Sequence, residues 1–312
     1  MILCCGEALI DMLPRVTEAG ETAFSPYVGG AVFNTAVALG RLGVPTEFYS
    51  GLSSDFFGQM LRDSLAQNHV GSRYAHISPQ PTTLAFVRLV DGQASYIFYD
   101  ENSAGRSLAP EHLPELDANV TALQFGAISL IPEPCGSTYE ALMAREHAKR
   151  VIILDPNIRP GFIPDKEKHL ARMRRMIAMS DIVKVSDEDL NWFGEVGSLE
   201  DVARRWLVEG DAIGPKLILL THGADGATGY TKRQAVQVPG QRVAVVDTVG
   251  AGDTFTAGVL ASLQENGALT KAGLAELTDR QIEAALTLGI KAATVTVSRA
   301  GANPPWRSEL AA

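Results

Sequence analysis

The segment DTVGAGDTF, residues 247–255, combines small residues with an acid directly before a helical pattern. Gly250, Ala251 and Gly252 would let the backbone approach a ligand closely, because they carry almost no side chain. A helix starting here would leave its first N–H groups unpaired, with partial positive charge at that end. These groups could hold phosphoryl oxygens. The helix dipole should keep the carboxylate of Asp253 ionised, so that it can accept a proton from an attacking hydroxyl. The segment suggests phosphoryl transfer, although an aspartate capping a helix is an equally good interpretation of these residues alone.

Two common phosphate-binding motifs do not fit this segment. A dinucleotide fingerprint, G-x-G-x-x-G, would need glycine at position 255, where the chain has Phe255. A P-loop would need Gly-Lys-Ser/Thr after the turn, and no such tripeptide follows. The glycine turn must therefore act, if it binds phosphate, through a different arrangement.

Alternating strand and helix patterns must position this turn. Short, near-continuous apolar runs predict buried strands at 2–5, 122–126, 151–155, 181–185 and 216–220. Apolar residues at spacings of three and four predict helices at 31–43, 136–149, 166–179, 253–267 and 279–297. This alternation is typical of an α/β protein with a mostly parallel sheet and helices on both faces.

One region breaks the alternation. Residues 82–100 contain two strand-like runs joined at Asp91-Gly92, a strong hairpin signal, and residues 12–28 lack helical periodicity. Together they could form a small sheet that projects from the main domain as a lid or a dimer contact. A simple edge hairpin fits the pattern equally well.

Composition limits the classes of function. The chain has 312 residues, 46% hydrophobic and 20% charged, and a formal net charge of −9, which argues against sequence-independent binding of nucleic acid. Its three cysteines, Cys4, Cys5 and Cys135, suit neither a disulfide framework nor a zinc site, and we interpret them as reduced core residues. The first residues lack the pattern of a signal peptide, and no apolar run reaches the roughly 20 residues of a membrane helix. We expect a cytoplasmic protein that does not contact membranes.

Several segments resemble one family in order and spacing. GGAVFNTAVALGRLG (29–43) and DTVGAGDTF resemble the two signatures of the ribokinase-like (PfkB) carbohydrate kinases, and GEALIDMLP (6–14), DPNIRPGF (155–162), KVSDEDL (184–190) and LTHGADG (220–226) match as well. The resemblance spans nearly the whole chain. It implies one ribokinase-like domain over 1–312, a three-layer α/β sandwich with a mostly parallel central sheet and a small antiparallel β lid formed by about 12–28 and 81–104.

The resemblance also implies roles for individual residues. It makes Asp253 the catalytic base and assigns the anion hole to the amides of Gly250, Ala251 and Gly252. It places Asp11, Gly30 and Asn34 against sugar hydroxyls, and Phe98 and Asn157 near the sugar. Arg159 would steady the γ-phosphate or a substrate hydroxyl. Alternatives from the residues alone are a solvated acid at Asp11, an ordinary helix position at Asn34, a surface arginine at Arg159 and sheet packing at Phe98.

Nucleotide and metal residues are implied in the same way. Lys184, Ser186, Thr221, Gly223 and Gly226 fall where the family holds ATP. Asp189 stands where a carboxylate, commonly Glu, orders Mg²⁺ through water, and Ser186 stands where Asn is frequent. Asp247 and the carbonyl of Val249 fall where many relatives bind K⁺. The acidic run 187–189 could equally be a helix N-terminus that benefits from the helix dipole.

The expected activity is therefore transfer of the γ-phosphoryl group of ATP to a hydroxyl of a small sugar. Within the family, GEALIDMLP and DPNIRPGF most resemble bacterial fructokinases, with 2-keto-3-deoxygluconate kinases as near neighbours, so we expect fructose as acceptor. Another family sugar or a nucleoside is the alternative acceptor. From other classes, a non-catalytic sugar-binding regulatory module and a nicotinamide-dependent oxidoreductase are the alternatives. We expect ATP, Mg²⁺ and K⁺ as cofactors, and a homodimer through the β lid.

Overall fold

A nine-stranded sheet forms the centre of the computed structural model, which describes residues 1–90, 93–208, 210 and 212–310. Across the sheet the strands are β15 (Ala235–Pro239), β14 (Gly226–Tyr230), β13 (Leu217–Thr221), β12 (Ile182–Ser186), β11 (Val151–Asp155), β10 (Ala122–Gly126), β1 (Ile2–Cys5), β4 (Thr46–Tyr49) and β6 (Val70–Gly71). All neighbours pair in parallel except β13 with β14 and β14 with β15. The mostly parallel sheet is confirmed, and two of the predicted strands begin and end one residue later than expected.

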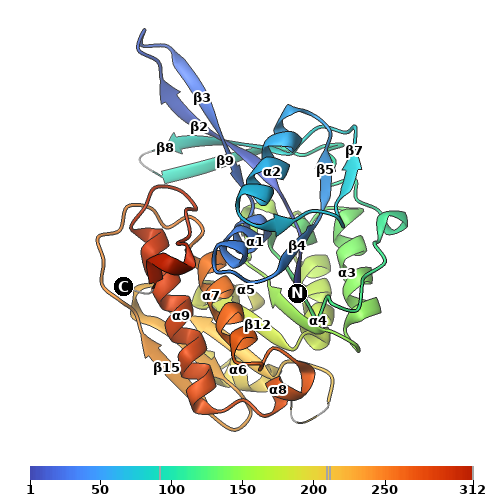
Figure 1. The fold of residues 1–312 in the computed structure, drawn as a ribbon, viewed down its shortest axis with the longest axis vertical. Helices are drawn as coiled ribbons and strands as arrows, with labels where there is room; N and C mark the ends of the chain where they lie inside the picture. Colours follow the sequence, from blue (N-terminus) through green and yellow to red (C-terminus); the bar gives the residue numbers. More distant parts are fainter. Residues whose placement is uncertain (91–92, 209, 211, 311–312) are drawn as a thin grey trace.

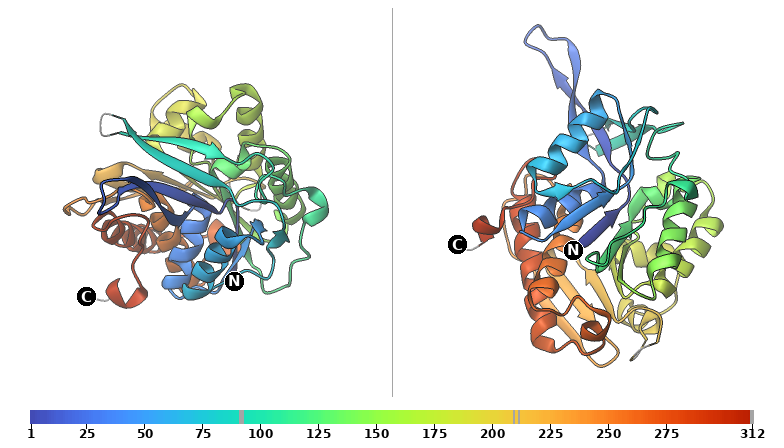
Figure 2. Two further views of the ribbon diagram at one scale, coloured as in Figure 1. Left: turned by 90° about the horizontal axis from the view of Figure 1, so that it is seen from above. Right: turned by 45° about the vertical axis from the view of Figure 1, so that its right-hand side comes forward.

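Helices cover both faces of this sheet (Figures 1 and 2). One layer contains α1 (Ala31–Arg41), α2 (Phe56–Gln67), α7 (Ala251–Glu265), α8 (Lys271–Ala275) and α9 (Asp279–Val297); the other contains α3 (Cys135–Glu146), α4 (Lys166–Met179), α5 (Asp187–Phe193) and α6 (Leu199–Trp206). Alternate residues along each strand enter one core or the other: Ile2 and Cys4 pack with the first layer, Leu3 and Cys5 with the second. The three-layer sandwich is confirmed, and all three cysteines are buried free thiols.

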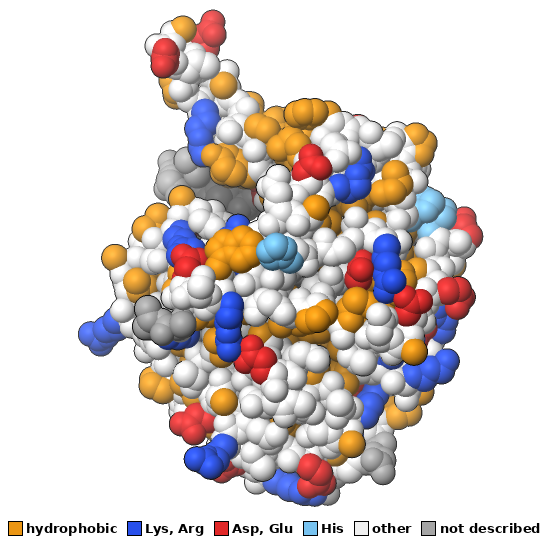
Figure 3. All heavy atoms as spheres, in the orientation of Figure 1, with side chains coloured by type: hydrophobic (Ala, Val, Ile, Leu, Met, Phe, Trp, Pro, Cys, Tyr) orange, Lys and Arg blue, Asp and Glu red, His pale blue; other side chains and the backbone are white. Residues whose placement is uncertain are grey.

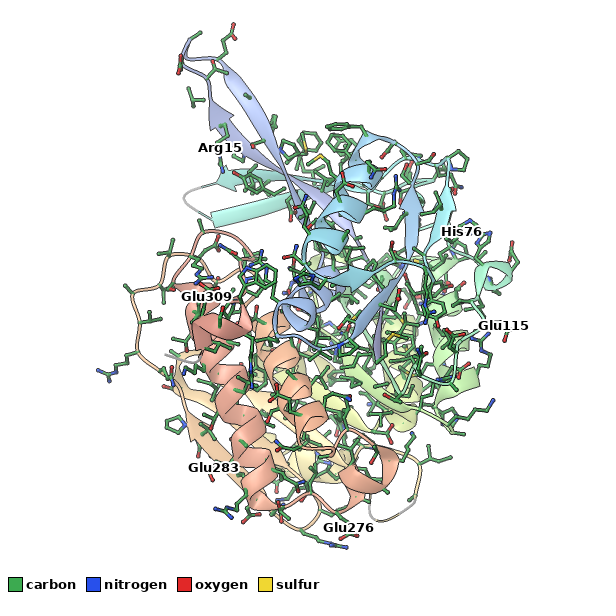
Figure 4. All side chains as sticks on the ribbon, in the orientation of Figure 1. Arg15, His76, Glu115, Glu276, Glu283 and Glu309 are labelled. Atoms are coloured by element: carbon green, nitrogen blue, oxygen red, sulfur yellow. The ribbon has the colours of Figure 1, made fainter. Side chains whose placement is uncertain are left out.

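A second, four-stranded sheet lies outside the three-layer sandwich. It runs in the order β3 (Thr22–Gly29), β2 (Leu9–Val16), β8 (Leu84–Val90) and β9 (Gln93–Tyr99). The β2–β3 hairpin projects beyond the helical layers, and Arg15, labelled in Figure 4, lies along it. The predicted hairpin within 82–100 is present as β8 and β9, while its Asp91-Gly92 turn lies outside the described residues. The sheet is not wholly antiparallel, because β2 and β8 pair in parallel.

The remaining elements are short. β5 (Gly51–Ser53) and β7 (His76–Ser78) form a two-stranded parallel sheet. Short 3₁₀ turns are η1 (Pro110–His112), η2 (Ala127–Leu130), η3 (Pro160–Phe162), η4 (Gly223–Asp225) and η5 (Arg307–Leu310). In the described part of the chain, no helix is both long enough and apolar enough to cross a bilayer.

Candidate active site

Asp253 lies on the first turn of α7 and is almost completely buried, with 6% of its surface exposed. Its Oδ2 accepts a hydrogen bond of 2.9 Å from the Asn34 side-chain amide, which comes from α1. Burial raises the pKa of Asp253 to about 7, and the Asn34 hydrogen bond only partly opposes that effect. From the sequence we expected the helix dipole to keep this carboxylate ionised; desolvation instead outweighs the dipole. The group can therefore both accept and release a proton near neutral pH.

The glycine turn places backbone amides beside this acid. Gly250 is the N-cap of α7 and adopts a left-handed conformation, with φ of 76°. Within the described ranges, the N–H groups of Gly250 and Gly252 have no hydrogen-bond acceptor in the protein. The Ala251 N–H differs from the predicted role, because it donates to the Thr248 carbonyl at a long 3.3 Å. Two of the three predicted amides are thus free, and the third carries a weak bond within the turn.

A buried cation lies next to the turn. Lys184, near the end of β12, places its Nζ 3.3 Å from Asp155 Oδ2, and both side chains are nearly inaccessible. A Cβ added to Gly252 would lie 3.3 Å from the same Nζ, so a side chain there would crowd the ammonium group. Burial lowers the pKa of Lys184, but Asp155, Asp189 and Asp253 together raise it further, so the ammonium stays charged. A fixed positive charge therefore lies beside the unpaired amides.

Ser186 and Asp189 form the capping box of α5. Asp189 Oδ2 accepts from the Ser186 N–H and hydroxyl, each at 2.8 Å, and its Oδ1 accepts from the Ile158 N–H at 2.8 Å. Residues 187–189 therefore form the first turn of a helix, as the alternative interpretation of this acidic run predicted. Asp189 also joins β12 to the loop after β11, and its part in ordering Mg²⁺ stays a prediction.

The predicted sugar residues come from the second sheet and α1. Asp11 on β2, Ala85 on β8 and Phe98 on β9 are register partners, so their side chains share one face of the sheet. Burial raises the pKa of Asp11 to about 6. Gly30, with φ of 111°, is the N-cap of the helix that carries Asn34.

A cavity of about 260 Å³ opens below Phe98, and the ring of Phe98 lies edge-on to Phe162 with 4.7 Å between centroids. Its lining also includes Glu7, Asp100 and Arg106, whereas Asp11, Gly30, Asn34 and Asp253 do not line it. Phe98 thus belongs to the wall of a cavity as well as to the packing of the sheet.

Arg159 and Asn157 follow β11. The Arg159 side chain is exposed and donates to the Ile158 carbonyl at 3.0 Å, and no contact to Asp253 is present. Asn157 adopts a positive φ of 42°, which is uncommon for a residue with a side chain. The structure brings neither residue to the buried acid, and their roles stay predictions.

The predicted nucleotide residues lie at the same sheet edge. Thr221 is the register partner of Ser186 at the ends of β13 and β12. Gly223 and Gly226 border the turn η4 with φ of 56° and 106°. A Cβ on Gly226 would lie 2.2 Å from the Val238 carbonyl, so this close approach requires glycine.

The Asp247 side chain accepts hydrogen bonds from backbone groups on both sides of the glycine turn. Its Oδ1 accepts from the Val249 N–H at 3.0 Å and its Oδ2 from the Gly301 N–H at 2.9 Å. Among the described residues, no three His, Cys, Asp or Glu side chains are grouped closely enough to hold a metal ion. K⁺ binding by Asp247 and the Val249 carbonyl therefore stays a prediction.

Sequence reasoning missed two acids. Glu7 accepts hydrogen bonds from the N–H groups of Ala31, at 2.8 Å, and Ser129, at 3.3 Å. Asp155 is the partner of Lys184. Each lies at or just beyond the carboxyl end of a predicted strand, where open parallel sheets bind ligands, and this position was the available signal.

Comparison with known proteins identifies the family to which the chain belongs. The sequence model for pfkB family carbohydrate kinase matches residues 1–309, and the chain belongs to this family. It is thus a phosphotransferase with an alcohol group as acceptor. The nicotinamide-dependent alternative is thereby set aside.

Individual relatives within the family are similar to this chain to different degrees. Over 282 residues, 90% of this chain and 85% of the relative, the sequence is 58% identical to fructokinase of Rhizobium leguminosarum bv. trifolii. The solved fructokinase of Xylella fastidiosa with bound ATP superposes with a TM-score of 0.87 at 30% identity, covering 99% of this chain and 96% of that one. Aminoimidazole riboside kinase from Salmonella enterica shares the fold, with a TM-score of 0.82 at 22% identity over 99% and 98% of the two chains.

Proposed function

We propose that this protein is a fructokinase that transfers the γ-phosphoryl group of ATP to a hydroxyl of fructose. The observation that carries the proposal is the buried Asp253, held by Asn34 beside unpaired helix amides. The identity to a bacterial fructokinase supports fructose as acceptor. The shared fold of a riboside kinase means that the acceptor must be argued from the site and not from the fold.

In the proposed reaction, Asp253 accepts the proton of the sugar hydroxyl as that oxygen attacks the γ-phosphorus. The new O–P bond forms while the bond to ADP breaks. The amides of Gly250 and Gly252 and the ammonium of Lys184 stabilise the negative charge on the phosphoryl oxygens. Asp11, Gly30 and Asn34 hold sugar hydroxyls, and Phe98 covers the sugar from water.

The charges around the cavity favour a neutral acceptor. Its lining contains the acids Glu7 and Asp100, and its one cationic side chain in the described residues is Arg106. Arg106 already pairs with both Asp100 oxygens, at 3.1 and 3.2 Å. We propose that the acceptor enters this cavity. A carboxylate or phosphate on it would then meet two acids and a cation already paired with one of them, so we favour fructose over 2-keto-3-deoxygluconate.

We also propose how the cofactors are held. Thr221, Gly223 and Gly226 lie against ATP, and Arg159 steadies the γ-phosphate. Mg²⁺ shields phosphate charge when bound; its protein contact would be through water on Asp189, whose oxygens already accept three hydrogen bonds. K⁺ would sit by Asp247 and the Val249 carbonyl and would steady the glycine turn.

The outer face of the second sheet supports a homodimer. The face opposite Asp11 and Phe98 carries Ile97 and Tyr99, which are 49% and 62% exposed, and Phe24, 43% exposed. Phe86 links two of these rings, with centroids 5.0 Å from Phe24 and 5.5 Å from Tyr99. Hydrophobic side chains gather at the base of the projecting hairpin (Figure 3). An apolar sheet face of this kind fits a second copy of the chain.

The direct test measures ADP release with MgATP and a panel of fructose, aldoses, 2-keto-3-deoxygluconate and nucleosides, each with and without K⁺. We expect fructose to give the highest kcat/KM and Asp253→Asn to lose several orders of magnitude in kcat while still binding ATP. If only 2-keto-3-deoxygluconate is turned over, that sugar acid and not fructose is the acceptor. Absence of turnover with every compound would favour the regulatory module.

A further inference from the structure

Glu7 is a partly buried acid that lies just past the end of β1 and has no assigned role. The backbone of the preceding residue, Gly6, is held from three sides. The Gly6 N–H donates to the Tyr49 carbonyl at 3.2 Å, and the Tyr139 hydroxyl donates to the Gly6 carbonyl at 3.1 Å. A Cβ on Gly6 would lie 2.4 Å from a Val32 methyl carbon, so α1 packs directly on this turn. The turn that carries Glu7 is therefore held in place by the core.

Helix α1 has no cap of its own. Its N-cap is Gly30, which has no side chain to accept from the first free amides. Glu7 Oε1 supplies the missing acceptor, with a 2.8 Å hydrogen bond from the Ala31 N–H. A Cβ on Gly30 would lie 2.7 Å from the Glu7 carbonyl oxygen, so the two backbones are in direct contact.

The other carboxylate oxygen reaches the opposite wall. Glu7 Oε2 accepts from the Ser129 N–H in η2 at 3.3 Å. Asn34 lies one turn beyond Ala31 on α1 and donates to Asp253 at 2.9 Å. One side chain thus connects the wall of the cavity, the start of α1 and, through Asn34, the buried acid on α7.

We propose that Glu7 is a positioning residue: by capping α1 from the β1 turn, it holds the Asn34 amide against Asp253. The inference rests on the proposed function, because it assigns Glu7 an effect on catalysis through Asn34. Glu7 does not accept the proton itself, although its charge contributes, after burial and Asp155, to the raised pKa of Asp253. The role requires two acceptor oxygens at this length of side chain.

A double-mutant cycle tests this role. Glu7→Gln keeps the shape of the side chain but replaces one acceptor oxygen by a donor. We expect it to lower kcat/KM for the sugar about tenfold, with a higher KM for the sugar and an unchanged KM for ATP. In the Asn34→Ala background the same change should cost no more than about twofold, because the group on which Glu7 acts is gone. An equal loss in both backgrounds would overturn the proposal.

The matched control is Asp181→Asn. Asp181 also accepts a hydrogen bond from a buried backbone amide, that of Ile152 at 2.8 Å, but it precedes β12 and so lies at the opposite edge of the sheet. We expect this change to lower the melting temperature without altering KM for the sugar. Equal effects of both variants on the sugar KM would mark Glu7 as merely structural.

A second measurement needs no turnover and separates this proposal from the proposed function. The side-chain NH₂ resonances of Asn34, followed by ¹⁵N NMR in the free protein, should shift in Glu7→Gln and stay in place in Asp181→Asn. Resonances unmoved by Glu7→Gln would refute the positioning role even in an active fructokinase. If the resonances shift but the protein phosphorylates no sugar, the contact between Glu7 and the Asn34 region is supported. In that case only the proposed function is refuted.

Discussion

At the scale of residues, the protonation of Asp253 should set the acid side of the pH profile. Its pKa of about 7 means that the carboxyl progressively loses the ability to accept a proton as pH falls. We expect kcat/KM for fructose to be level above about pH 8 and to drop about tenfold per pH unit below pH 7. Below pH 6 the slope should steepen, because Asp11, with a pKa of about 6, also becomes protonated. Rates measured from pH 5 to 9 check both steps, and a flat profile across pH 7 would contradict them.

The same acid should lower the stability of the fold. Burial raises its pKa from 3.8 to about 7, so the folded state binds the proton more tightly than the unfolded chain. Stability therefore falls as pH rises through this interval, by at most roughly 4 kcal/mol above pH 7. Asp253→Asn removes the buried charge and should raise the melting temperature at pH 8 by several degrees, with little change at pH 4. Thermal unfolding of both proteins at the two pH values decides this, and a lower melting temperature of the variant at pH 8 would count against it.

At the scale of elements, the start of α7 depends on a left-handed glycine. Gly250→Ala should be strained twice, because φ is 76° and the new Cβ would lie 2.7 Å from that of Ala302. We expect a loss of about 1–3 kcal/mol in unfolding free energy and a larger fall in kcat than stability alone explains. Gly267→Ala is the matched control, since φ is 67° just past the other end of α7 with no atom within 4 Å of the new Cβ. Urea unfolding and steady-state rates compare the two, and equal falls in kcat would mean that the turn serves only the helix.

The second sheet should affect sugar binding through one face alone. Phe98→Ala opens the wall of the cavity where Phe98 meets Phe162, so KM for fructose should rise several-fold while KM for ATP stays constant. Tyr99→Ala, one residue along and on the opposite face, should leave KM for fructose unchanged. Initial rates over both substrates separate the two variants. A rise in KM for ATP with Phe98→Ala would remove Phe98 from the sugar site.

At the scale of the whole molecule, the apolar outer face of the second sheet should control assembly. Ile97→Glu places a charge in that face and should convert the proposed dimer to a monomer. Val196→Glu is the control, because Val196 is 87% exposed on the loop between α5 and α6. Analytical ultracentrifugation gives the mass of each protein. A monomeric wild type would exclude the proposed dimer. A dimer that persists in Ile97→Glu would mean that the contact lies elsewhere.

Most of this architecture could be predicted from the sequence. Continuous apolar runs such as VIILD indicated strands covered on both faces, and β11 has the predicted bounds, Val151–Asp155. The glycine turn could be predicted because glycine admits backbone conformations and close approaches that other residues exclude. The pairing of β2 with β8 in parallel was not, because it joins segments that are distant in sequence and leaves no local pattern.

The contacts around the buried acid were also beyond sequence reasoning. Family resemblance pointed to Asn34 and Asp253 separately, but their hydrogen bond depends on how α1 packs against α7. The raised pKa of Asp253 is a property of the whole environment, since burial outweighs the helix dipole. Glu7 was overlooked because an acid after a strand resembles any solvated loop acid until its two amide partners are known.

The hydrogen bond between Asn34 and Asp253 joins positions 219 residues apart. During synthesis Asn34 is made long before Asp253, so the two side chains can pair only after α7 has formed and packed against α1. Catalysis therefore begins only when the last third of the polypeptide has left the ribosome and docked. Turnover of a newly made molecule would then serve as a clock for the end of its folding.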